Sequence, residues 1–283
     1  MDFFDLHSDT PYECYTKNEQ FYVNQLAVSG EAAKCFDNWV QTFAIWIRDD
    51  IKNPFELYKN IYNDFKGKIE NCPENLKPVL AVEGGAVLEN DLDRLEILKG
   101  DGIKFLTLTW NGENRIAGGA DTDKGLTDFG KKAIEKMNRL KIGADLSHLN
   151  EKSFFAAVEK ADFPICTHSS SREIVNHKRN LTAAQANLIA EKGGVIGICL
   201  YPRFTGADIF EGVYRNIFHF CELGLENNIS IGCDFDGCEM DAKLCKTAQI
   251  PSLYSYLTQK GFKKDIIDKV FYKNALNYIE KLD

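Results

Sequence analysis

The chain alternates short apolar runs with longer amphipathic segments. Five segments have apolar residues at helical spacing, and they are 91–99, 126–140, 150–161, 181–192 and 213–227. The segment 181–192 opens with Thr182 and Gln185, a capping-box pair, and ends before Gly193. Eight apolar runs are typical of buried strands, and they are 3–8, 39–47, 78–84, 103–110, 141–148, 163–168, 194–201 and 229–235.

This order of elements favours one fold class. Near-continuous apolar strands separated by helices predict a parallel sheet covered on both faces. Eight such strands, in a chain near the roughly 250 residues typical of the fold, predict an α/β protein built as a (β/α)8 TIM barrel. A doubly wound sheet usually has a glycine-rich loop after its first strand, and residues 7–13 contain no glycine. No linker or change of composition divides the chain, so we expect a single catalytic domain over residues 1–283.

A TIM barrel carries its catalytic side chains at the carboxyl ends of its strands. Any one polar residue at such an end has an ordinary structural explanation, such as a hydrogen-bonded core side chain or a helix cap. Repetition at five of the eight predicted ends favours a functional site instead. The residues at these ends that are able to bind a metal are His7, Asp9, Glu83, His148, His168 and Asp234.

Three histidines and several carboxylates suit a divalent ion, with zinc the first choice and manganese or cobalt also possible. Five strong ligands exceed the three that a single catalytic zinc takes from the protein, which favours two metals. Glu83 would then lie between them, with His7 and Asp9 on one ion and His148 and His168 on the other. A hydroxide held between two such ions is a nucleophile at neutral pH.

The other histidines and the cysteines follow different patterns. His219 lies in a helical segment and His177 in a polar loop, so neither is assigned to a metal. Cys233, Cys238 and Cys245 lack the spacing of a structural zinc site. The nine cysteines are an odd number with mostly apolar neighbours, which favours reduced thiols and a cytoplasmic location.

Charge and hydropathy exclude several classes of partner. The 34 basic and 42 acidic residues give a net charge of -8 and are interleaved, so nucleic acid is not an expected partner. The charged run 260–282 is interpreted as a solvated helix face. The first residues lack the features of a signal peptide, and no segment has the length of apolar sequence that a membrane span needs, so we expect no membrane association.

The chain contains, in this order, the stretches LHSDTP, AVEGG, LTLTWN, GLTDFGKKAIEKMNRLKIGADLSH, THSSSREIVNHKRNLT, GGVIGICLY and IGCDFDG. Together these stretches resemble the membrane (renal) dipeptidase family of binuclear zinc peptidases, in a soluble microbial form. The resemblance implies an amidohydrolase-type barrel, two zinc ions per chain, the same five ligands with Glu83 shared, and a dipeptide substrate. It also implies that Arg179 binds the substrate carboxylate and that Asp234 moves the proton.

Two further positions follow from the same resemblance. Tyr201 matches a pocket position, where its hydroxyl can hydrogen-bond the substrate. Trp110 stands where animal members carry a histidine, and an indole can donate a hydrogen bond but cannot take a proton. The family also implies a homodimer and substrates that include dipeptides with a C-terminal D-residue.

Two other functions stay open on the sequence alone. One is a different metal-dependent amide or lactam hydrolase on the same barrel, which would not need Arg179 to recognise a carboxylate. The other is a metal-binding barrel without catalysis, for which Trp110 is the motive. Asp234 argues against the second, because a binding protein does not need a group that shuttles protons.

Overall fold

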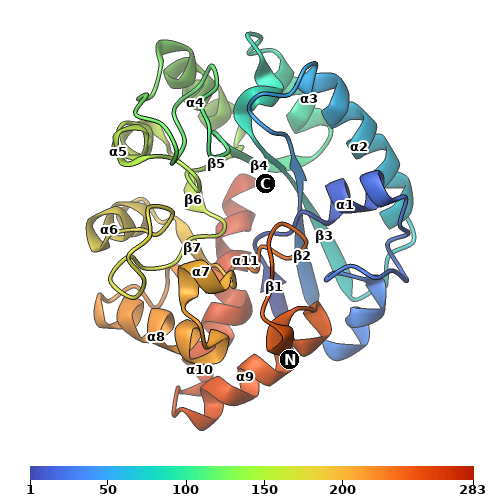
Figure 1. Cartoon of the computed structure of the whole chain (residues 1–283), viewed down its shortest axis with the longest axis vertical. Coiled ribbons are helices and arrows are strands. Elements are labelled where there is room, and N and C mark those ends of the chain that lie inside the picture. The colour runs from blue at the N-terminus through green and yellow to red at the C-terminus, as the bar shows by residue number, and fades with distance from the viewer.

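The computed structural model describes residues 1–283, in which eight parallel strands close into a barrel in chain order (Figure 1). Each strand pairs with the next, and the pairing of Asp5 with Ile231 joins the last strand to the first. The predicted TIM barrel is confirmed, since each predicted run overlaps an observed strand. The strands are β1 (Phe3–Asp5), β2 (Trp39–Trp46), β3 (Leu76–Glu83), β4 (Ile103–Thr107), β5 (Gly143–Asp145), β6 (Pro164–Cys166), β7 (Val195–Ile198) and β8 (Ile229–Ile231).

Helices surround the barrel and include all five predicted ones, now α3, α4, α5, α6 and α8. The predicted capping box opens α6: the Thr182 hydroxyl accepts from the backbone N–H of Gln185, whose side chain accepts from the N–H of Thr182. A membrane crossing would need a longer and more apolar helix than any found here. The α-helices are α1 (Thr10–Lys17), α2 (Pro54–Ile69), α3 (Arg94–Gly100), α4 (Asp128–Leu140), α5 (Glu151–Lys160), α6 (Ala183–Glu191), α7 (Pro202–Thr205), α8 (Ile209–Glu222), α9 (Ile250–Gln259), α10 (Lys264–Asp268) and α11 (Asn274–Ile279).

The buried apolar residues form two clusters, one outside the strands and one within them. The larger lies between strands and helices and includes Phe43 and Val82. The smaller includes Val40, Ala44 and Ala81, which alternate along β2 and β3 with members of the larger cluster. Because successive side chains of a strand point to opposite faces, the smaller cluster fills the inside of the barrel.

Helix α11 closes one end of this interior. Tyr278 and Leu282 belong to the inner cluster, and the ring of Tyr278 lies 6.0 Å from that of Phe105 on β4. The Tyr278 hydroxyl donates to the carbonyl of Phe163, just before β6. The interpretation of 260–282 as a helix with a solvated charged face agrees with this packing, because Lys264, Lys273 and Glu280 are exposed while the apolar side packs under the strands. In Figure 1 this helix, in red, runs close to the middle of the barrel.

The opposite end, where the strands finish, is polar. Glu83 is the last residue of β3, whereas His148, His168 and Asp234 lie two or three residues beyond β5, β6 and β8. His148 and Asp234 adopt left-handed backbone conformations, with φ of 71° and 63°. Such conformations are uncommon for residues other than glycine and recur at functional sites.

Candidate metal centre

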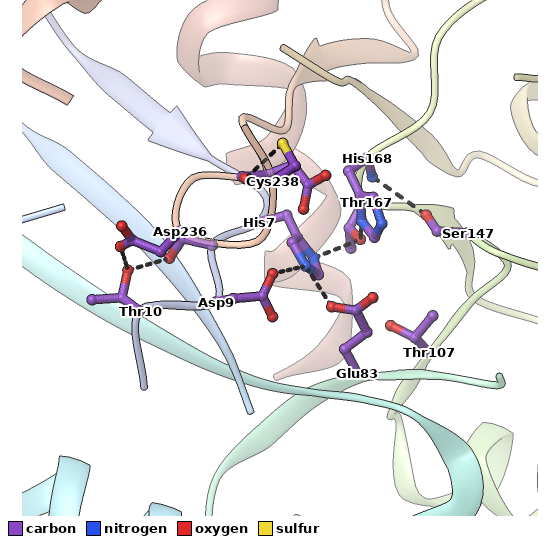
Figure 2. Close-up of polar contacts among 12 residues, drawn as sticks. His7, Asp9, Thr10, Glu83, Thr107, Ser147, Thr167, His168, Asp236 and Cys238 are labelled. Carbon is purple, nitrogen blue, oxygen red and sulfur yellow. Dashed lines mark hydrogen bonds and ion pairs between the residues drawn. The ribbon is translucent and has the colours of Figure 1, made fainter. Parts of the chain in front are cut away.

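The end of β3 and the loops after β1, β5, β6 and β8 bring the predicted strand-end residues into one buried cluster. Three overlapping groups of residues could each hold a metal ion, because within each group one nitrogen or oxygen atom per residue lies within 4.8 Å of the others. The groups are His7 with Asp9 and Glu83, Glu83 with His148 and His168, and His7 with His168 and Asp234. All six residues are at most 9% exposed. Figure 2 shows His7 between Asp9 and Glu83, with His168 beside it. The structure thus places all six predicted residues together.

Glu83 presents one carboxylate oxygen to each half of the cluster. Its Oε2 atom lies 2.9 Å from Nε2 of His7, and its Oε1 atom lies 2.8 Å from Nε2 of His148. A carboxylate whose two oxygens face different imidazoles has the arrangement needed to bridge two cations.

His7 and Asp9 reach the cluster by a route other than a continuing strand. Strand β1 ends at Asp5, and Asp9 is the residue that precedes α1. The backbone N–H of Asp9 donates to the carbonyl of Phe235, which ties this turn to the loop after β8. Nε2 of His7 lies 3.7 Å from Oδ2 of Asp9, and Oδ1 of Asp9 is buried without a hydrogen-bond partner. An orphaned carboxylate oxygen in a buried polar cluster is a fitting metal ligand.

The carboxylates of the cluster lie close together although ionised carboxylates repel one another. Burial and the neighbouring Glu83 carboxylate hold the pKa of Asp9 well above its usual value. Burial raises the pKa of Asp234 to about 6, and Glu83 adds to the effect. Burial also disfavours a charged Glu83, but His7 and His148 outweigh it and hold the pKa of Glu83 well below its usual value. Bound cations would relieve the repulsion that the chain alone leaves in place.

On one side of the cluster, the surroundings of His148 and His168 favour the neutral imidazole, which is the form that binds metals. Burial and the nearby Arg179 lower the pKa of His148 to about 4, and burial with two neighbouring imidazoles holds the pKa of His168 well below its usual value. Their Nε2 atoms are 2.7 Å apart. For His7, burial is outweighed by the carboxylates of Glu83 and Asp9, which raise its pKa. Neutral imidazoles and converging carboxylates are a donor set that fits divalent metal ions.

A cavity of about 330 Å³ opens beside the cluster. Among its lining residues are Asp9, Glu83, Trp110, Arg179, Tyr201 and Asp234. The Arg179 side chain is buried, and its Nη2 atom donates to Nε2 of His168 over 2.9 Å, so its charge is paired with an imidazole rather than a carboxylate. The predicted substrate residues therefore share one cavity with the predicted ligands.

Aromatic rings form part of the cavity wall. Trp46, which the sequence analysis did not single out, packs edge-on against both Tyr12 and Trp110. On another side Tyr201 packs edge-on against Phe204 at 4.9 Å. Trp46 is the last residue of β2, a strand whose end carries none of the predicted polar residues. Aromatic side chains at strand ends therefore also indicate the position of the site.

Support for His148 comes from a loop that the sequence did not indicate. Nδ1 of His148 lies 2.9 Å from Oδ1 of Asn111. The loop that carries Asn111 is held by Asp49, whose carboxylate accepts from the backbone N–H groups of Trp110 and Gly112. The available signal was Asp49 in the charged run Arg48–Asp50 after β2, and such a run is also typical of the surface.

The residues excluded by the sequence analysis lie elsewhere. His219 is 3.8 Å from Glu173, and His177 packs against Phe204 while its Nδ1 accepts from the N–H of Arg179. Neither belongs to the metal-competent groups, nor do Cys238 and Cys245.

Comparisons relate the chain to proteins of known sequence and structure. At 29% identity over 232 residues, the chain resembles an uncharacterised protein in the pqqA 5' region of Klebsiella pneumoniae, covering 76% of this chain and 86% of that protein. At 26% identity over 222 residues, it resembles an uncharacterised dipeptidase of Schizosaccharomyces pombe, covering 75% of this chain and 54% of the yeast protein. The chain thus spans about half the length of that dipeptidase.

The fold is shared with a metallopeptidase of Rhodobacter sphaeroides, solved with a phosphinate mimic of the dipeptide L-Ala-D-Ala. The TM-score is 0.90 at 21% identity, over 100% of this chain and 99% of that one. The family model described as membrane dipeptidase, peptidase family M19, matches residues 64–283. Because this match covers most of the chain, the protein belongs to the membrane dipeptidase family, a family of metal-dependent dipeptidases.

Proposed function

We propose that this protein hydrolyses small dipeptides with a free C-terminal carboxylate and that it uses two metal ions, zinc in the first place. The observation that carries the proposal is Glu83, whose two oxygens face His7 and His148 separately. His7, Asp9 and Glu83 would hold one ion, and Glu83, His148 and His168 the other. Manganese or cobalt would suit the same donors.

The chain's own residues supply the remaining chemistry. Bound divalent ions provide the Lewis acidity that activates water near neutral pH and polarises the scissile carbonyl. Asp234 lies in the cavity, with its carboxylate grouped with His7 and His168. From there it would accept a proton from the attacking water and deliver it to the leaving amine.

Arg179 would recognise the free carboxylate of the substrate. Its guanidinium is buried in the cavity wall and is 6% exposed. A guanidinium binds a carboxylate through two parallel hydrogen bonds, which fixes the orientation of the substrate as well as its charge. The mimic of L-Ala-D-Ala in the Rhodobacter sphaeroides structure supports dipeptides with a C-terminal D-residue among the substrates of this chain.

Tyr201 and Trp110 would shape the pocket rather than move protons. The Tyr201 hydroxyl can hydrogen-bond the substrate, and the Trp110 indole can donate one hydrogen bond while its ring excludes water. Nine free cysteines support a reducing compartment, and we include a cytoplasmic location in the proposal on that ground.

The test is amino-acid release from L,L and L,D dipeptides and their C-terminally amidated counterparts, with protein stripped of metal and titrated with zinc. Activity that saturates at about two zinc per chain and that falls on amidation would support both the metal count and the carboxylate subsite. Turnover of amidated and free dipeptides at equal rates would instead favour the amide or lactam hydrolase.

Arg179→Met separates these outcomes further. We expect it to lower kcat/KM for free dipeptides by about 100-fold or more, because a buried charged hydrogen bond is lost, and to leave the slow cleavage of amidated substrates unchanged. Arg203→Met is the matched control, since Arg203 is exposed and lies over the Tyr201 ring at 5.9 Å.

A further inference from the structure

The hydroxyl of Thr167 lies between two histidines assigned to different metal ions. Thr167 Oγ1 is 3.0 Å from Nδ1 of His7 and 2.9 Å from Nδ1 of His168. The chain separation between His7 and Thr167 is 160 residues, so only the closed barrel brings them together. Figure 2 shows Thr167 next to both rings, on the side away from Asp9.

The hydrogen-bonding capacity of threonine fixes the direction of these contacts. A hydroxyl has one hydrogen to donate and two lone pairs with which to accept. Oδ2 of Asp145 is 2.7 Å from Thr167 Oγ1 and accepts that hydrogen. The contacts with His7 and His168 must then use the lone pairs, which requires an N–H at Nδ1 of both rings. Nε2 of each ring is left to face the metal centre.

Asp145 is a fully occupied acceptor, which makes the direction firm. The residue is completely buried on β5. Its Oδ2 atom accepts from the hydroxyls of Thr107 and Thr167, at 2.6 and 2.7 Å. Its Oδ1 atom accepts from the backbone N–H groups of Ser147 and Thr167, at 3.0 and 3.1 Å. Four donors match the capacity of one carboxylate, so Asp145 has no hydrogen bond left to offer the imidazoles directly.

The backbone of Thr167 is fixed as tightly as its hydroxyl. A Cβ atom added at Gly197 or Gly232 would come 1.9 or 1.7 Å from the Thr167 carbonyl oxygen. The two glycines let β7 and the end of β8 close directly onto this residue. This packing holds in place the backbone that carries the hydroxyl.

We propose that Thr167 is the positioning residue that fixes the Nδ1–H tautomers of His7 and His168 together, and so couples the affinities of the two metal positions. The inference rests on the proposed assignment of these histidines to different ions. Groups that orient metal-binding imidazoles commonly change metal affinity by 10- to 100-fold when they are removed. Here one hydroxyl serves a ligand of each ion, so both affinities should fall together.

The test compares Thr167→Val, which keeps the shape and loses the hydroxyl, with Thr167→Ser, which keeps the hydroxyl. Zinc affinity is measured by competition with a chelator, and zinc content by mass spectrometry. Thr167→Val should bind both ions about 10- to 100-fold more weakly, and Thr167→Ser should return both close to the wild-type affinity. Thr107→Val is the control, because Thr107 donates to the same oxygen of Asp145 but is hydrogen-bonded to neither imidazole.

Nitrogen-15 NMR of labelled histidine gives a readout that a general loss of stability would not change. The chain has five histidines, so each ring can be assigned. Zinc-loaded wild-type protein should show slowly exchanging Nδ1–H protons on His7 and His168, and Thr167→Val should lose the protection of both. In metal-free wild-type protein His168 should carry its proton at Nδ1, a measurement that decides the matter even if Thr167→Val does not fold.

Three results would overturn the inference: undiminished zinc affinity in Thr167→Val, weakening of only one ion, or an Nε2–H tautomer of His168 in the metal-free protein. These results are distinguishable from failure of the proposed function. If His168→Ala keeps two zinc ions per chain, the ligand assignment itself is wrong. If Thr167→Val binds zinc as tightly as the wild type, only the proposed coupling is refuted.

Discussion

The two ends of the barrel solve opposite problems with the same strands. At one end the inner residues are apolar, and Tyr278 of α11 and Leu282 of the turn after it cover them. At the other end, two to four residues further along the strands, the inner side chains are carboxylates and imidazoles with strongly shifted pKa values. The comparison indicates that the apolar end stabilises the fold, whereas the polar end lowers its stability because the residues there serve binding and catalysis.

The largest expected effect is on activity at the polar end. Asp234→Asn should lower kcat by about 10²- to 10⁴-fold, the range for loss of a general acid–base group, while zinc binding through the other five residues continues. Asp236→Asn is the control, since its oxygens accept from Thr10 and the N–H of Ala27. Steady-state kinetics with a small dipeptide checks both, and equal losses would assign the proton to another group.

The closed end should respond in stability and not in chemistry. Tyr278→Ala should cost about 4 kcal/mol, as for other large buried aromatic residues, because the cavity under the strands cannot collapse. The residue is 1% exposed. Thermal unfolding with zinc present measures the loss, and activity per folded molecule should stay near wild type at a temperature where both proteins are folded.

Tyr278→Phe separates packing from hydrogen bonding at the same position. It retains the ring and leaves the carbonyl of Phe163 without this donor, so we expect a loss of about 1 to 2 kcal/mol. A Tyr278→Ala variant as active and as stable as wild type would contradict the division of labour between the two ends.

The third prediction is that Asp234→Asn, which lowers activity, raises the stability of the metal-free protein. The pKa of Asp234 is raised by burial from 3.8 to about 6. An acid with a raised folded-state pKa favours folding when protonated, so its ionisation weakens the metal-free fold as pH rises from about 4 to above 6. A shift of about two pKa units corresponds to about 3 kcal/mol. Metal-free Asp234→Asn should therefore be more stable than metal-free wild type at pH 7 and equal to it at pH 3.

Denaturant unfolding of both metal-free proteins across this pH range checks the sign. A stability difference that is the same at pH 3 and pH 7 would show that ionisation of Asp234 is not its cause. With zinc bound, the advantage of the variant should shrink, because the cations stabilise the ionised carboxylate of the wild type.

The same two ends explain what could be predicted from the sequence. Apolar runs of strand length and the polar residues after them depend on neighbours along the chain, and they gave the barrel and the cluster around Glu83. Helix α2 was not predicted although its signal is present, since Tyr58, Ile61 and Phe65 are buried at helical spacing after Pro54. That omission was in the interpretation and not in the sequence.

Other features depend on three-dimensional closure and have no local signal. The apolar spacing of 260–282 did not indicate what the buried side of α11 packs against, because its partners lie on strands far away in the chain. Thr167 directly precedes His168 in the chain, and only the closure of the barrel brings its hydroxyl close to His7 and Asp145. The sequence does not distinguish zinc from manganese or cobalt, because the three metals share the same donor chemistry.

The smallest predicted effect distinguishes support inside the barrel from support by a loop. Nδ1 of His148 donates to Asn111, which lies on an irregular segment tied to Asp49, whereas Thr167 is enclosed by strands. Asn111→Ala should weaken one zinc by about tenfold, at the low end of the usual range, because the loop can supply water in its place. Asn111→Asp, which keeps an acceptor, should bind as well as wild type. Chelator competition would show two ions weakened for Thr167→Val and one for Asn111→Ala, and weakening of both ions by Asn111→Ala would mean that the coupling runs through shared Glu83 instead of through Thr167.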